Sequence, residues 1–313
     1  MYSALLEKIK GARTIAIFRH KQPDGDAIFS QSALQSFLQD NFPDKEVRVC
    51  GADVCDLLDN REIVSDEFIA GALGIALDCA NLERLDDSRI LTAPYIIKID
   101  HHPNIAPYGQ LQIVKEEASA TCEVLAEIFF SKPFADLLIS KRTAEYLLCG
   151  ILTDTLAFST SNTSSKTLAM AAELVSIGDL KMAELQHRLF DMSYDLFKKR
   201  AALANLLEIK GAVGFVILSA EDLDGLGMSL REAKNSVASF GKIRELKAWA
   251  IFVYNREKGS YEASLRSVRE YPINAIAEAY GGGGHKNAAG IKDLSLEACK
   301  EIIDKLQLLT CGF

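Results

Sequence analysis

The chain lacks any apolar stretch long enough to cross a lipid bilayer, and its first residues, Met1 to Lys8, do not follow the order of a secretory signal. We therefore expect a cytoplasmic location and no membrane partner. The seven cysteines are odd in number and lack C-x-x-C spacing, which argues against a disulfide framework and against a thiolate zinc site. We expect reduced, mostly buried thiols.

The chain also lacks an excess of basic residues. Its formal net charge of −8 argues against tight attachment to long nucleic acid such as duplex DNA, because such binding needs a basic surface. Short RNA or a small phosphorylated nucleotide remains compatible with this charge where cations offset the carboxylates. No internal repeat and no low-complexity tail is found, so a compact globular protein is the expectation.

The composition and length indicate a soluble α/β protein of two domains. Of the 313 residues, 49% are hydrophobic and 25% are charged, and aliphatic runs alternate with amphipathic helical stretches. We expect a catalytic domain over residues 1–186, a charged linker helix over 187–209 and a smaller domain over 210–313. Apolar helices could support a homodimer, although no surface patch requires one.

Strands and helices alternate in the first part, which predicts βαβ units and a mainly parallel sheet. The expected strands cover residues 14–19, 46–50, 73–77, 95–99 and 111–114. The second part has short β-rich runs with hairpin-like spacing, which predicts a smaller α+β domain. These runs cover residues 212–218, 247–253 and 261–267, with Trp249 and Phe252 as expected core residues.

The most unusual stretch is Asp100-His101-His102, which follows the apolar run 95–99. The carboxyl ends of strands are where α/β folds build their sites, and packing alone gives no reason for an acidic residue and two imidazoles there. Other apolar elements of the first part also end in carboxylates or histidine. The candidate set comprises His20, Asp24, Asp26, Asp78, His101 and Asp154.

Four carboxylates at one sheet edge would repel one another unless their pKa values rose or cations entered. Mixed imidazole and carboxylate ligands favour a transition metal, and the excess of oxygen favours Mn²⁺ over zinc. Six ligands suit two ions that share one carboxylate, roughly 3.5–4 Å apart with water or hydroxide between them. That geometry suits in-line attack on phosphorus, so the pattern predicts phosphoester hydrolysis.

Each candidate also has a simpler interpretation. Asp24 and Asp26 could be turn residues, since they lie in a Pro-Asp-Gly-Asp sequence. Asp78 and Asp154 could cap helices, and the histidines could be satisfied, partly buried groups. The metal site is the better interpretation because these residues recur at the ends of several elements.

A second region of interest is the segment Gly281 to Gly290, which begins with four consecutive glycines. The glycines could form a mobile turn, or they could let backbone N–H groups converge on an anion, with His285 as a further phosphate donor. Arg266, near a strand end, could make a bidentate phosphate contact or could be ordinary surface charge.

Together these residues resemble the DHH phosphoesterase superfamily. The motifs of the first part are His20-x-x-x-Asp24-x-Asp26, Asp78, Asp100-His101-His102 and Thr153-Asp154. In the second part, Arg266 and the glycine-rich segment are similar to the DHH-associated domain of the oligoribonuclease/pAp-phosphatase branch, called NrnA-like. The resemblance covers nearly the whole chain, and the combination of motifs is more specific than any one of them.

The resemblance implies a two-domain phosphodiesterase or phosphatase, with two divalent metal ions, Mn²⁺, in the first domain and substrate capture by the second across a cleft. One ion would bind His20, Asp24 and Asp78. The other would bind Asp26, Asp78, His101 and Asp154, so that Asp78 bridges.

By the same resemblance, Asp78, His102 and Asp100 are the catalytic residues, with His102 facing the scissile phosphate and Asp100 orienting an imidazole. The implied substrate contacts are His102, Arg266, Gly283, Gly284 and His285. The chain departs from the family pattern at Phe29, where a glycine is common, and at Cys79-Ala80-Asn81. These departures keep every implied ligand but affect the expected substrate preference.

The function expected first is manganese-dependent hydrolysis of very short RNA from an end to nucleoside 5′-monophosphates by a metal-bridging hydroxide. A second expected substrate is 3′-phosphoadenosine 5′-phosphate, which would give AMP. The nearest alternative is a phosphodiesterase for cyclic or linear dinucleotides (c-di-AMP, pApA), and a non-catalytic nucleotide sensor is the alternative from another class. A RecJ-like DNA exonuclease is disfavoured because no basic stripe is evident, and an inorganic pyrophosphatase because of Arg266 and His285.

Overall fold

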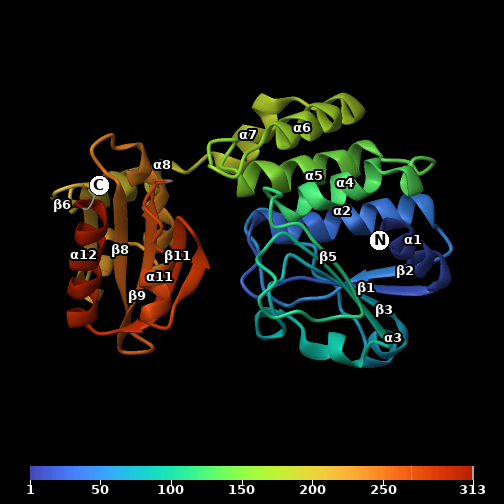
Figure 1. Ribbon diagram of the computed structural model, residues 1–313, viewed down its shortest axis with the longest axis horizontal. Coiled ribbons are helices and arrows are strands. Elements are labelled where there is room, and N and C mark those ends of the chain that lie inside the picture. The colour runs from blue at the N-terminus through green and yellow to red at the C-terminus, as the bar shows by residue number, and fades with distance from the viewer. Residues whose placement is uncertain (269, 312–313) are drawn as a thin grey trace. The chain divides into compact units, whose positions relative to one another are not determined.

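The computed structural model describes residues 1–268 and 270–311. Its contacts divide the chain into two compact units, Met1–Asp191 and Met192–Phe313 (Figure 1). The division falls inside the segment 187–209, which we expected to connect two domains as one helix. The chain there instead leaves one helix at Phe190 and starts another at Tyr194, because the Ser193 side chain caps the new helix by accepting a hydrogen bond from its backbone.

The first unit contains a five-stranded sheet. Its strands are β1 (Thr14–Phe18), β2 (Glu46–Val49), β3 (Leu73–Leu77), β4 (Tyr95–Asp100) and β5 (Leu111–Val114). Its α-helices are α1 (Tyr2–Gly11), α2 (Gly25–Asn41), α3 (Asp66–Gly71), α4 (Thr121–Phe130), α5 (Lys141–Asp154), α6 (Ser165–Gly178) and α7 (Met182–Phe190). Its 3₁₀ helices are η1 (Leu82–Arg84), η2 (Ser88–Thr92) and η3 (Lys132–Phe134).

All neighbouring strands of this sheet are parallel, and their order is β2-β1-β3-β4-β5. The parallel sheet predicted from the alternating pattern is therefore confirmed, and each strand lies where one was predicted. Because β1, β3 and β4 are adjacent and run in the same direction, their carboxyl ends meet at one edge.

Helices cover both faces of the sheet, with α2, α4 and α5 on one face and α3 on the other (Figure 1). The strand residues alternate accordingly: Ile15 and Ile17 of β1 join the core beneath α2, whereas Ala16 and Phe18 join the core on the α3 face. All four side chains are fully buried. This double burial explains why the central strands β1 and β3 are continuous apolar runs.

One surface position of this unit should be stabilised by glycine. Asp179 ends α6 with φ +44°, a left-handed conformation that L side chains adopt at a cost, and its side chain is 88% exposed. We expect Asp179→Gly to raise the free energy of unfolding by about 0.5–1 kcal/mol without altering activity. Denaturant unfolding measures this. Asp179→Ala is the control, because it removes the carboxylate but keeps the Cβ atom, and an equal gain from alanine would contradict the reasoning.

The second unit contains a six-stranded mixed sheet. Its strands are β6 (Glu208–Lys210), β7 (Val213–Leu218), β8 (Ala248–Asn255), β9 (Ser260–Ser267), β10 (Gly283–His285) and β11 (Ala288–Leu294), in the order β10-β11-β9-β8-β7-β6. Its helices are α8 (Tyr194–Ala204), α9 (Ala220–Leu226), α10 (Leu230–Asn235), η4 (Ser236–Lys242), α11 (Asn274–Ala279) and α12 (Leu296–Cys311). The predicted smaller α+β domain is thus confirmed.

Two details of this sheet differ from the expectation. The strands β7 and β8 are parallel rather than a hairpin, since α9, α10 and η4 lie between them in the chain and cover one face. The glycine run is not one turn, because Gly283 to His285 pair with β11 as a strand. Trp249 and Phe252 are buried core residues, as predicted, and the Trp249 Nε1 donates to the Val237 carbonyl at 2.9 Å.

Two further observations concern membrane-spanning helices and the cysteines. Among the residues that the structure describes, no helix combines the length and apolar character needed to cross a membrane. The seven cysteines are all unpaired thiols, and each of them except Cys311 is buried.

Candidate metal centre

Three of the predicted ligands meet at the carboxyl edge of the parallel sheet. His20 follows β1, Asp78 follows β3 directly and His101 follows β4 directly. All three side chains are buried. Their strands are adjacent, so the sheet itself brings these three residues together.

The other three predicted ligands come from helices that pack beside this edge. Asp24 caps the amino end of α2, Asp26 lies in its first turn, and Asp154 is the last residue of α5. The two helices approach so closely that a Cβ atom at Gly25 would lie 2.4 Å from the Thr153 hydroxyl oxygen. Glycine is therefore needed where α2 passes the end of α5.

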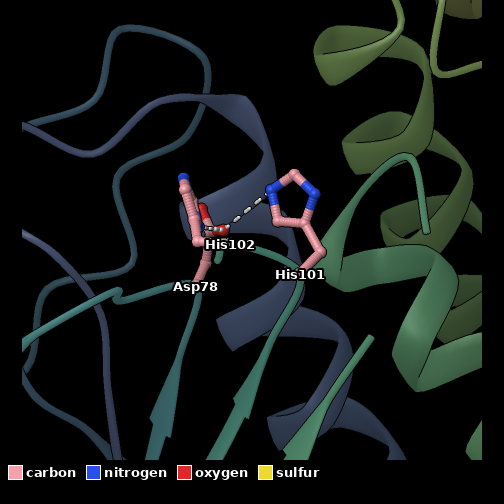
Figure 2. Close-up of side chains that lie close together, drawn as sticks. All are labelled: Asp78, His101 and His102. Atoms are coloured by element: carbon pink, nitrogen blue, oxygen red, sulfur yellow. Dashed lines mark ion pairs between the residues drawn. The ribbon is translucent and has the colours of Figure 1, made fainter. Parts of the chain in front are cut away.

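Asp78 lies within ion-pair distance of His101 and His102 (Figure 2), and His20 approaches it as well. Its Oδ2 atom lies 3.4 Å from His20 Nε2, while its Oδ1 atom lies 3.5 Å from His101 Nε2 and 3.4 Å from His102 Nδ1. The residue has φ +53°, a strained conformation for an aspartate. The carboxylate consequently has one oxygen toward the β1 side and one toward the β4 side.

The potential ligand atoms form three overlapping groups, in each of which the atoms lie within 4.8 Å of one another. The groups are His20 with Asp24 and Asp78, Asp78 with His101 and His102, and Asp26 with His101 and Asp154. The structure thus brings all six predicted ligands into one cluster, and it adds His102. Groups of imidazoles and carboxylates at this spacing can hold a transition metal.

The histidines present the nitrogen that a metal would need. His20 Nδ1 lies 2.8 Å from the Lys21 carbonyl and His101 Nδ1 lies 3.3 Å from the Ala118 carbonyl, so each Nδ1–H can donate to the backbone. Each Nε2 lone pair then faces the carboxylates. In the described part of the chain, the buried Nε2 of His20 has no hydrogen-bond partner, which fits a position that a metal ion completes.

Asp26 is held by the amino end of α4. Its Oδ2 accepts a hydrogen bond from the Thr121 backbone at 2.6 Å, and its Oδ1 accepts one from the Cys122 backbone at 3.0 Å. Burial, followed by the charges of Asp78 and Asp154, raises the pKa of Asp26. The two N–H groups and the helix dipole oppose that rise by stabilising the carboxylate.

The pKa values of the cluster reflect burial and the charges of neighbouring side chains. Burial raises the pKa of Asp154 to about 7, and the nearby His101 only partly offsets this. Burial would lower the pKa of His20, but Asp24 and Asp78 outweigh it and raise the pKa to about 11. Without a metal ion the imidazoles therefore carry the compensating protons, which a divalent cation would displace.

Asp100 belongs to a different network. Its Oδ1 accepts hydrogen bonds from the His101 and His102 backbone and lies 2.8 Å from His102 Nδ1, so it orients that ring. Its Oδ2 lies 3.3 Å from the ammonium of Lys98, a fully buried lysine that also donates to the Ala80 carbonyl at 2.9 Å. The sequence reasoning missed this role of Lys98, although one charged residue inside an apolar strand was a usable signal.

The internal lysine does not neutralise the cluster of candidate ligands. Lys98 pairs with Asp100, whereas the cationic partners of Asp24, Asp78 and Asp154 within residues 1–268 and 270–311 are histidines. Thr121 was also missed, although its hydroxyl donates to Asp78 Oδ1 at 3.0 Å. No local pattern pointed to it, because the two residues are 43 positions apart.

The simpler interpretations hold in part. Asp24 does cap α2, with its Oδ1 atom, yet its Oδ2 atom lies 3.7 Å from His20 Nε2. Asp78 caps no helix, because Asn81 caps the η1 turn that follows it. Asp154 ends α5, and Ser164 caps the next helix, so a capping role does not account for either residue.

The second unit places Arg266 and His285 in one row of its sheet. Ala288 of β11 is paired with Arg266 of β9 on one side and with His285 of β10 on the other. Residues directly opposite in antiparallel strands lie on the same face, so this face carries both side chains. Burial lowers the pKa of the Arg266 guanidinium, whose Nη1 donates to the Leu265 carbonyl at 2.8 Å.

Comparison with known proteins agrees with this architecture. Residues 14–151 match the DHH family, N-terminal domain, and residues 208–309 match the DHHA1 domain. The probable bifunctional oligoribonuclease and PAP phosphatase NrnA of Streptococcus mutans is 37% identical over 98% of this chain and 98% of that protein. The bifunctional oligoribonuclease and PAP phosphatase NrnA of Bacillus subtilis is 32% identical over 99% of this chain and 98% of its own length. The chain belongs to the DHH phosphoesterases, in their NrnA-like branch.

This membership makes the chain a hydrolase of phosphoester bonds, as the residues at the strand ends predicted. The fold is also that of a solved exopolyphosphatase-related protein from Bacteroides fragilis, with a TM-score of 0.87 and 24% identity, covering 99% of this chain and 97% of that one. For the DHH phosphoesterase described here, the histidine and carboxylate cluster is the place where a metal can bind.

Proposed function

We propose that this DHH phosphoesterase binds two Mn²⁺ ions and hydrolyses short oligoribonucleotides to nucleoside 5′-monophosphates, and 3′-phosphoadenosine 5′-phosphate to AMP. The observation that carries the proposal is the placement of Asp78, whose two carboxylate oxygens lie near different groups of potential ligands. The two NrnA relatives, named as oligoribonuclease and PAP phosphatase, support the choice of substrates.

In this proposal the six predicted ligands divide between two sites that share Asp78. His20, Asp24 and Asp78 form the first site. The second site is formed by Asp26, Asp78, His101 and Asp154. A bound pair of divalent cations would offset the carboxylates, polarise the phosphoryl group and supply an activated water.

The residues around the cluster would position the phosphate. Asp100 holds Nδ1 of His102 and so fixes the direction of the ring, which lies beside Asp78. His102 would then contact the scissile phosphate, while the buried Lys98 pairs with Asp100 and holds its carboxylate in place. Asp100 thus pairs with Lys98 and orients the His102 ring, whereas other carboxylates would bind the cations.

Substrate binding would also use the second unit. Arg266, His285 and the backbone of Gly283 and Gly284 would bind a phosphate or sugar of the substrate. A glycine-rich strand leaves its backbone accessible, and the three residues of β10 are exposed. The Arg266 guanidinium, in the same row of the sheet as His285, adds a cation to this face.

Arg266→Ala should mainly weaken substrate capture. We expect KM for 3′-phosphoadenosine 5′-phosphate to rise about 10–100-fold with little change in kcat, because the lost contact is made in the ground state and in the transition state alike. Steady-state kinetics at saturating Mn²⁺ measure this. Arg231→Ala, at an exposed residue of α10, is the control and should behave as the wild type. An unchanged KM for Arg266→Ala would count against the assignment.

The function itself is tested with the purified full chain, with and without Mn²⁺. We expect AMP from 3′-phosphoadenosine 5′-phosphate and mononucleotides from a 5′-labelled RNA dinucleotide, with much slower turnover of a long RNA. Hydrolysis of a cyclic dinucleotide alone would support the alternative phosphodiesterase. No turnover of any substrate, with metal binding demonstrated, would contradict catalysis and favour the nucleotide sensor.

A further inference from the structure

Thr121 contacts two of the cluster carboxylates at once. It is the first residue of α4 and is fully buried. Its backbone N–H donates to Asp26 Oδ2 at 2.6 Å, and its hydroxyl donates to Asp78 Oδ1 at 3.0 Å. Thr121, at the start of α4, therefore links Asp26 in the first turn of α2 to Asp78 at the end of β3.

The two contacts of Thr121 depend on different parts of the residue. Asp26 is held by the backbone N–H groups of Thr121 and Cys122, which any residue other than proline would supply. Thr121 contacts Asp78 through its side-chain hydroxyl. A side-chain substitution can thus remove the second contact and leave the first in place.

The Thr121 hydroxyl affects the orientation of the Asp78 carboxylate. Rotation about the Cβ–Cγ bond of an aspartate has a broad energy profile, so the backbone alone does not fix its oxygens. The Asp78 oxygens lie 3.4–3.5 Å from the nearby imidazole nitrogens, whereas the Thr121 hydroxyl is at 3.0 Å. The bond to Oδ1 uses one lone pair and leaves another for the cluster.

We propose that Thr121 is the positioning residue for the shared carboxylate. Its hydroxyl holds Asp78 with one oxygen toward His20 and the other toward His101, which is the orientation that serves two ions. This proposal rests on the proposed two-ion site. Without the hydroxyl, the carboxylate turns toward one side, and the other site loses a ligand.

The test compares two substitutions that differ in the hydroxyl. Thr121→Val keeps the shape and the backbone N–H but removes the hydroxyl, whereas Thr121→Ser keeps the hydroxyl. Calorimetric titration of the metal-free chain with Mn²⁺ should show affinity at one site weakened about 10–100-fold in Thr121→Val and near the wild-type value in Thr121→Ser. We expect kcat to fall with the metal affinity while KM for 3′-phosphoadenosine 5′-phosphate stays nearly constant.

A matched control separates this effect from the loss of any buried hydroxyl. Thr143 is equally buried, lies in the first turn of α5, and donates its hydroxyl to Ser36. Thr143→Val should leave the Mn²⁺ titration unchanged. Circular dichroism of each metal-free variant confirms that the chains compared are folded, and Thr121→Ala serves if the valine variant does not fold.

The outcomes distinguish the inference from the function on which it rests. A wild-type chain that binds fewer than two ions overturns the proposed two-ion site. If the wild type binds two ions and Thr121→Val binds them with unchanged affinity, the positioning role is wrong. Equal losses in Thr121→Val and Thr121→Ser would also overturn it, because the hydroxyl would then not be the cause.

Discussion

Replacing Asp78 with alanine should lower kcat/KM for 3′-phosphoadenosine 5′-phosphate by about 10³-fold or more. Loss of residues that merely support metal ligands typically costs about 10–100-fold, and Asp78 would be a ligand of both ions. Its Oδ2 faces His20 and its Oδ1 faces His101, so the substitution removes an oxygen from each site. Steady-state kinetics at saturating Mn²⁺, together with the number of bound ions, measure the effect.

Asp24→Ser provides the graded comparison for this experiment. Serine still caps α2, so the helix start is kept, while the carboxylate of one site is lost. The Asp24 side chain is 60% exposed, and it belongs to only one of the three potential metal groups. We expect a smaller loss than in Asp78→Ala. Near-normal rates for Asp78→Ala, or equal losses for both variants, would refute the shared carboxylate.

Asp154→Asn should change stability in opposite directions with and without metal. In the metal-free chain, burial raises the pKa of Asp154 to about 7 from an ordinary value of 3.8, so its ionised form is unfavourable in the fold. An asparagine removes that cost and should raise the free energy of unfolding at pH 8 by roughly 1–3 kcal/mol. With saturating Mn²⁺ the variant should be less stable than the wild type, because it has lost a ligand.

The sign of this effect follows from proton linkage. An acid whose pKa is raised by folding contributes stability that is fully present below pH 3.8 and is lost as the pH rises through about 7. The metal-free wild type should therefore lose this contribution between about pH 4 and 7, and Asp154→Asn should not. Thermal or denaturant unfolding across pH, with and without Mn²⁺, measures both. The same sign of change with and without metal would contradict the role of Asp154 as a ligand.

Much of the first unit could be predicted because its central strands, such as β1 and β3, are continuous apolar runs. Strands buried on both faces show this pattern, and residues 73–77 were predicted with the boundaries that the structure has. The candidate ligands at strand ends followed from the parallel order, since neighbouring strands end at or just before His20, Asp78 and His101. Local sequence was sufficient to predict these strands and the residues at their ends, because the apolar pattern of a strand also indicates where it lies in the fold.

The remaining features depend on contacts between distant parts of the chain. Thr121 binds Asp26 from 95 positions away, and nothing near either residue indicates it. The left-handed conformation of Asp78 arises at a strand end without a glycine to signal it. The glycine run 281–284 suggested a turn or an anion nest, but part of it forms β10, because its pairing with β11 satisfies the backbone.

The number of Mn²⁺ ions bound per chain, measured by equilibrium titration of the metal-free full chain, tests whether divalent cations balance the charge of the site. In the described residues, histidines are the cationic partners of Asp24, Asp78 and Asp154, so divalent cations should complete the balance. We predict two ions per wild-type chain and a clear loss of bound ions in Asp78→Ala. Binding of no ion or of one ion, or the same count for both proteins, would contradict the paired-metal site.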